Sequence, residues 1–113
     1  MNIYLAGPMS GNKDHNFPAF FAAAKQLRKQ GHTVFSPAEV DLEDYEDHQA
    51  IDDDEANRGK HAVWRERLAV DFEWIMLKAD AVFVLPGWEE SWGVNAELAL
   101  ADALYLEIVY LDE

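Results

Sequence analysis

Residues 81–87 read Ala-Val-Phe-Val-Leu-Pro-Gly. Five consecutive apolar residues, most of them β-branched or aromatic, predict a β-strand, and Pro86-Gly87 predict the turn that ends it. A strand without polar alternation is typical of one that is covered on both faces, as in the middle of a parallel sheet. Such a sheet needs helices on either side, so this stretch predicts an α/β fold.

The sequence on either side of this strand supplies the remaining strands and helices. Strands are expected at residues 2–6, 32–36, 80–85 and 107–111, and helices from a capping Asn16 to a terminating Gly31, from about 60 to 79, and at 93–104. This alternation predicts one domain over residues 1–113, with a small doubly wound parallel sheet of the flavodoxin or Rossmann-like kind. We expect four to five strands flanked by helices.

Composition and charge exclude several classes of protein. The chain has 113 residues, of which 22 are acidic and 9 basic, and its net charge of −13 argues against a nucleic-acid polymer as partner. Without cysteine, it has no disulfide, no cysteine-ligated zinc and no thiol nucleophile. No apolar run approaches the roughly 18 residues of a membrane span, so we expect a cytoplasmic protein without membrane contact.

Residues 41–57 contain nine acidic side chains in seventeen positions. They lack the glycine that a calcium loop requires, so a solvated loop, long enough to form a lid, is the better interpretation. The four histidines show no ligand spacing. We therefore predict neither a metal site nor a cofactor.

Two loops at the expected carboxyl ends of strands are candidates for ligand binding. The first loop, with Gly7, Met9, Ser10 and Gly11, matches neither a P-loop nor a dinucleotide fingerprint, and it is either a tight turn or a place where a ligand approaches the backbone. In the later loop, Ser91 and Gly93 suit an anion, and Trp88 and Trp92 suit a planar ring. The alternative is that Ser91 only caps a helix and that the tryptophans only pack.

Two carboxylates fall on apolar helical faces. Asp71 shares a face with Trp64, Leu68, Ile75 and the stem of Lys78, and Glu97 shares one with Val94, Ala101 and Leu104. A poorly hydrated carboxylate can act as a nucleophile toward a sugar carbon. The alternatives are a buried acid satisfied by its neighbours for Asp71 and a capping glutamate for Glu97.

Four segments resemble the nucleoside 2-deoxyribosyltransferase-like superfamily. They are Ile-Tyr-Leu-Ala-Gly-Pro-Met-Ser-Gly at 3–11, Leu27-Arg28 with Gly31-His32-Thr33-Val34 and Ser36-Pro37, Asp71 with Ala79-Asp80-Ala81-Val82, and Ser-Trp-Gly-Val-Asn-Ala-Glu at 91–97. The chain looks closest to a small phage and bacterial branch that is similar to 2′-deoxynucleoside 5′-monophosphate N-glycosidases.

This resemblance implies cleavage of an N-glycosidic bond, with Glu97 as the nucleophile at C1′, Asp71 near the sugar and base, and Tyr4 positioning the glutamate. Transferases that use free nucleosides tend to have an acid six residues before the nucleophile, where this chain has Ser91. A serine there accommodates a phosphate, so a deoxynucleotide is favoured over a deoxynucleoside as the partner. Because the predicted sheet is small, we also expect a homodimer. Hydrolysis and base exchange both stay open.

Two other functions are compatible with the same residues. The first is a non-catalytic module that binds or senses nucleotides, in which Glu97 only accepts hydrogen bonds from the ligand. The second is a structural subunit whose acidic loop binds a protein partner.

Overall fold

The computed structural model describes residues 1–9, 16–39 and 54–112, and for residues 54–64 it defines the helix without the side chains. The elements are β1 (Asn2–Ala6), α1 (Phe17–Lys29), β2 (Thr33–Phe35), α3 (Asp54–Leu77), β3 (Ala81–Val84), the 3-10 turn η2 (Trp88–Glu90), α4 (Trp92–Ala103) and β4 (Glu107–Tyr110). The predicted alternation of strands and helices is confirmed.

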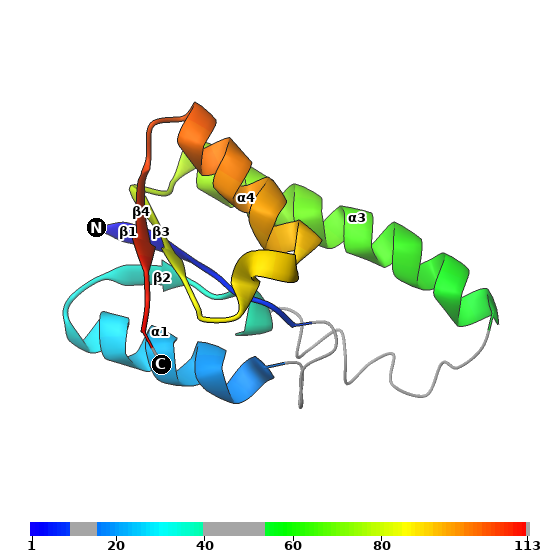
Figure 1. The fold of residues 1–113 in the computed structure, drawn as a ribbon, viewed down its shortest axis with the longest axis horizontal. Helices are drawn as coiled ribbons and strands as arrows, with labels where there is room; N and C mark the ends of the chain where they lie inside the picture. Colours follow the sequence, from blue (N-terminus) through cyan, green and yellow to red (C-terminus); the bar gives the residue numbers. More distant parts are fainter. Residues whose placement is uncertain (10–15, 40–53, 113) are drawn as a thin grey trace.

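The four strands form one parallel sheet in the order β2-β1-β3-β4 (Figure 1). β1 pairs with both β2 and β3, and Tyr4 lies opposite Phe35 on one side and Val82 on the other. The second strand of the chain, β2, lies on one side of β1, and the two later strands, β3 and β4, lie on the other side. Between β1 and β3 the direction of winding reverses, and ligands of such sheets bind beyond the carboxyl ends of the strands at that point.

Successive residues of β1 point to opposite faces of the sheet, as the period of a strand requires. Ile3 and Leu5 pack into an apolar cluster with α1, whereas Tyr4 and Ala6 pack into a second cluster with α3 and α4. The first cluster also contains Phe17, Phe20, Ala24, Leu27, Val34, Ala38 and Leu85, and the second contains Ile75, Val82, Val84, Val94, Leu98 and Ala101. Helices on both faces confirm the doubly wound architecture.

Both ends of α1 lie where the sequence predicted them, but only one of the two predicted caps forms. Gly31 ends the helix with φ of +94°, and the bonds from Gly31 N–H to Arg28 O and from His32 N–H to Leu27 O form a Schellman motif. Asn16 occupies the N-cap position, but its side chain makes no capping hydrogen bond. The expected cap is therefore wrong: Asn16 is left-handed, with φ of 62°, and Pro18, in the first turn, has no N–H to donate.

α3 begins at Asp54, earlier than the periodicity predicted, so residues 54–57 of the expected acidic loop are helical. The remainder of that loop, residues 41–53, lies outside the described residues. At the other end α3 stops at Leu77, and Lys78 follows it as an exposed turn residue. The prediction that Lys78 shares the apolar face of this helix with Asp71 is therefore wrong.

With 24 residues, α3 is about 36 Å long and extends well past the sheet and α4 (Figure 1). Among the described residues, no helix combines the length and apolarity needed to cross a membrane.

Candidate functional site

Tyr4 lies at the centre of the candidate site, on β1 in the middle of the sheet. Its side chain has no exposed surface, and its hydroxyl donates a hydrogen bond to Oε2 of Glu97. Glu97 is 5% exposed and occupies the buried stripe of α4 together with Val94, Leu98 and Ala101. A carboxylate thus lies where helical spacing would otherwise place a hydrocarbon side chain.

Asp71 brings a second carboxylate to the same hydroxyl from α3, one turn before the buried Ile75. Burial, then the charges of Glu97 and Asp71, and finally their hydrogen bonds raise the pKa of Tyr4 well above 10. The tyrosine therefore keeps its proton and serves as a donor throughout the neutral range. Both acids that the sequence singled out meet at one neutral phenol.

Two further aromatic rings hold the phenol in place. Phe35 on β2 stacks on Tyr4 with centroids 5.6 Å apart and planes 16° apart, and Trp74 on α3 lies 6.4 Å from Tyr4 and 5.3 Å from Phe35. Phe35 and Trp74 are not among the site residues expected from the sequence. Trp74 follows Asp71 by three residues, so helical spacing already placed both on one side of α3.

Ser91 is the N-cap of α4, because its Oγ accepts the Val94 N–H at 3.3 Å. The Asn95 side chain donates to the carbonyl oxygens of Ser91 and Glu89, which fixes the turn before the helix. The capping alternative for Ser91 is thereby confirmed, and this bond uses Oγ as an acceptor and not the hydroxyl proton. Among the described residues, a Cβ at Gly93 would meet nothing within 4 Å, so their packing does not explain this glycine and leaves the backbone there approachable.

Packing explains Gly7, the first of the two glycines in the first loop. A Cβ on Gly7 would lie 2.8 Å from Leu85 Cδ1 and 3.0 Å from Phe20 Cζ, so only glycine lets β1 leave the sheet between these side chains. Met9 is half-buried and packs against the same cluster. Ser10 and Gly11, the other candidates of this loop, lie outside the described residues.

The two candidate tryptophans lie in different surroundings. Trp88 is half-buried, and its ring lies 5.3 Å from that of Tyr110 at the end of β4, which β3 separates from β1. Trp92 is 86% exposed at the first residue of α4.

Ser36 is a further polar residue that the sequence analysis missed. It directly follows β2, is 3% exposed, and its Oγ has no hydrogen-bond partner among the described residues. Buried hydroxyls are usually paired, so Ser36 offers a polar atom close to the carboxyl edge of the sheet. Within the described part of the chain, no three His, Asp or Glu side chains gather in a way that could hold a metal ion.

The fold and the site define a doubly wound α/β domain with two carboxylates on a buried tyrosine of its central sheet. Comparison with known families matches residues 1–110 to DUF4406, described as a domain of unknown function, and the chain belongs to this family. No curated protein matches the sequence.

Proposed function

We propose that this protein cleaves the N-glycosidic bond of a 2′-deoxyribonucleoside 5′-monophosphate, with Glu97 as the nucleophile. The observation that carries the proposal is the buried Glu97 carboxylate, which accepts a hydrogen bond from the Tyr4 hydroxyl. Asp71 interacts with the same hydroxyl. A carboxylate removed from water and held by a neutral donor is poised to attack an electrophilic carbon.

In the proposed reaction, the Glu97 carboxylate attacks C1′ through an oxocarbenium-like transition state, and the bond between C1′ and the base nitrogen breaks. The electron pair of that bond leaves with the base, which takes up a proton. Water then attacks C1′ and releases the sugar phosphate and Glu97, or a second base attacks and gives exchange. Tyr4 stays neutral because its pKa is raised, so it donates to Glu97 in every step. Asp71 orients the sugar hydroxyl and the base.

The phosphate is held in this proposal at the start of α4, by the Ser91 hydroxyl and the backbone near Gly93. Three observations support this proposal: Ser91 caps α4, no described residue crowds the position of Gly93, and Glu97 lies in the second turn of the same helix. Trp92 at the start of α4 covers the planar ring, since Trp88 packs beside Tyr110. A homodimer and a cytoplasmic location belong to the same proposal.

The reversal of winding between β1 and β3 also supports the proposal. Tyr4 is on β1, and the chain after β3 leads into the turn that begins α4. Substrate groups beyond these two strand ends lie next to the helix that carries Glu97.

Chromatography of free base tests the proposal. The purified protein is incubated with each 2′-deoxynucleoside 5′-monophosphate, with each deoxynucleoside, and with an added acceptor base. We expect base release or exchange from at least one nucleotide, and a loss of at least about 10³-fold in Glu97→Gln. Circular dichroism and nucleotide binding of the variant should match the wild type. Nucleotide binding without release or exchange of base by the folded wild type would contradict catalysis and favour the sensing module.

A further inference from the structure

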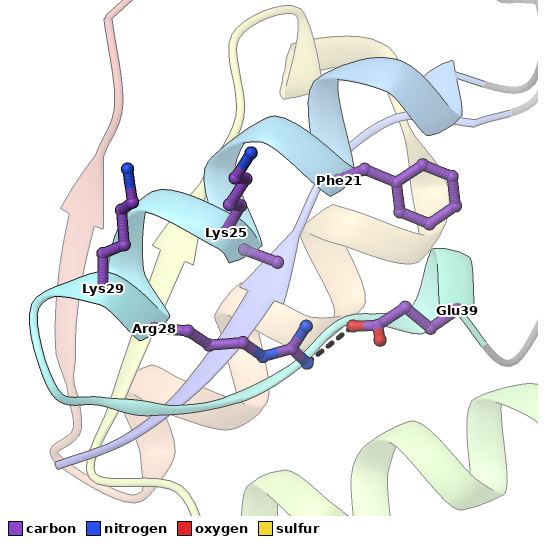
Figure 2. A pocket seen from close by; sticks show the side chains of 6 residues that line it. Phe21, Lys25, Arg28, Lys29 and Glu39 are labelled. Atoms are coloured by element: carbon purple, nitrogen blue, oxygen red, sulfur yellow. Dashed lines mark hydrogen bonds and ion pairs between the residues drawn. The ribbon is translucent and has the colours of Figure 1, made fainter.

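Two surface hollows lie apart from the Tyr4–Glu97 pair, and they carry opposite charge. The first, which we call the basic groove, has a volume of about 550 Å³ and is lined by Phe21, Ala24, Lys25, Arg28, Lys29 and Glu39 (Figure 2). The second, which we call the aromatic hollow, has a volume of about 480 Å³, and its lining includes Trp88, Glu89, Tyr110 and Asp112.

The basic groove concentrates positive charge in a chain whose net charge is −13. α1 contains no acidic residue, and Lys25 and Lys29 lie one turn apart, where like charges destabilise a helix. Arg28 is engaged already, with Glu39 at 2.6 Å and the Val34 carbonyl oxygen at 2.8 Å. Figure 2 shows the two lysine side chains pointing away from this ion pair. The lysines are therefore placed to interact with a negative group of another molecule. Phe21, which is 38% exposed, adds an apolar surface to the same groove.

The aromatic hollow has the complementary chemistry. The Trp88 and Tyr110 rings lie 5.3 Å apart, and Tyr110 is 53% exposed. Glu89 and Asp112 add carboxylates, and no Lys, Arg or His follows Lys78 anywhere in the sequence. Aromatic faces and carboxylates together attract ammonium groups.

We propose that the basic groove of one copy of this chain binds the aromatic hollow of a second copy. Lys25 and Lys29 then meet Glu89 and Asp112, and the apolar parts of both surfaces pack together. The groove lies on the β2 side of the sheet and the hollow at the end of β4, the opposite edge. The contact is therefore head to tail and is separate from the homodimer of the proposed function, and each pair leaves one groove and one hollow to which further copies add. This inference does not depend on the chemistry at Glu97.

Salt should control this contact in a defined way. Copies of net charge −13 repel one another, but at 0.15 M salt this repulsion is screened beyond about 8 Å. Complementary charges in direct contact are screened less, so association should be strongest near physiological salt and weaker at both 0.01 M and 1 M.

Sedimentation over a range of micromolar concentrations at 0.15 M salt tests the proposal with charge exchange. We expect the average mass of the wild type to rise with concentration, and the variants K25E/K29E and E89K/D112K each to associate at least about 10-fold more weakly. An equimolar mixture of the two variants should regain association, because each then presents a surface complementary to one on the other. Lys78→Glu, an exposed lysine outside both surfaces, is the matched control and should behave as the wild type.

Three results would overturn the proposal: a wild type that stays monomeric throughout, charge variants that associate as strongly as the wild type, or a mixture that gains nothing over its components. Circular dichroism of each variant establishes that it is folded. Since the readout is mass, base release plays no part in it, and failure of this contact is distinguishable from failure of the proposed catalysis.

Discussion

The cluster described under α1 is built from apolar side chains, whereas the cluster under α3 and α4 also receives a phenol and a carboxylate. On the α1 face, Ile3 and Leu5 pack against Phe20 and Leu27. On the opposite face, the neighbouring residue Tyr4 meets Glu97 and Asp71. Burial of polar groups costs free energy even when they are paired, and apolar side chains of similar volume are often at least as stable. The first face is thus a plain apolar core, and the polar groups on the second face are the basis of the proposal that it serves a ligand.

The largest expected effect on stability is on the α1 face. Phe20→Ala removes a fully buried ring from the cluster with Ile3 and Leu5, and should lower the free energy of unfolding by about 3–5 kcal/mol. Phe21→Ala is the matched control on the same helix, because Phe21 is 38% exposed, and should cost about 1 kcal/mol or less. Urea unfolding measures both values. Equal losses for the two variants would contradict the assigned core.

The next effect concerns the ring that positions Tyr4. Trp74→Leu removes the aromatic contact to Tyr4 and Phe35 and should lower kcat for base release by about 10²-fold with little change in KM, because the phenol and Glu97 lose their alignment. Trp74→Phe keeps a ring and should retain most of the activity. Steady-state kinetics of both variants measure this split. A loss confined to KM, or identical behaviour of the two variants, would show that Trp74 does not position the site.

The raised pKa of Tyr4 predicts a loss of stability at high pH. Below about pH 10 the residue is protonated in both the folded and the unfolded chain, so its contribution is complete. Above that pH the unfolded chain releases the proton while the folded chain keeps it, and stability should fall by about 1.4 kcal/mol per pH unit until the folded residue also ionises.

Urea unfolding of the wild type and Tyr4→Phe from pH 9 upward measures this slope, and the variant should lack the contribution. In an absorbance titration of the folded proteins, the difference between the two should appear only well above pH 10. A difference already complete at pH 10 would contradict the buried hydrogen-bonded hydroxyl.

The smallest effect separates two roles of Ser91. Ser91→Ala removes the cap of α4 and should cost about 1 kcal/mol of stability. Ser91→Asp restores a capping acceptor but places a negative charge beside the proposed phosphate, so it should keep stability and raise KM for nucleotides more than for nucleosides. Thermal unfolding and kinetics on both substrate classes check this. An unchanged nucleotide preference in Ser91→Asp would leave Ser91 as a cap alone.

Local sequence patterns predicted the fold because strands and helices of this size are set by local periodicity and turn residues. β1 has the predicted bounds, and the other strands differ by about one residue at their ends. α3 was predicted to begin too late, because its first turns are polar and show no apolar stripe. The Asn16 cap was wrong because the backbone conformation, which the residue type does not fix, decides whether the side chain reaches the first turn.

The candidate site was predicted in part. Asp71 and Glu97 stood out as acids among apolar neighbours, and the structure brings both to Tyr4. Phe35 and Trp74 did not stand out, because an aromatic residue on an apolar face is indistinguishable from an ordinary core residue until tertiary contacts are known. Gly7 shows the converse: its motif suggested a ligand loop, whereas its contacts with Leu85 and Phe20 supply a packing reason.

The central claim is that Glu97 forms a covalent bond to a deoxyribose. Mass spectrometry after incubation with a 2′-fluoro-2′-deoxynucleoside 5′-monophosphate tests it most directly, because the fluorine slows the release of a glycosyl-enzyme intermediate. We predict one fluorosugar phosphate per chain, on the peptide that contains Glu97, and none on Glu97→Gln. A folded wild type that binds the nucleotide and acquires no adduct, or acquires it on another residue, would contradict the claim.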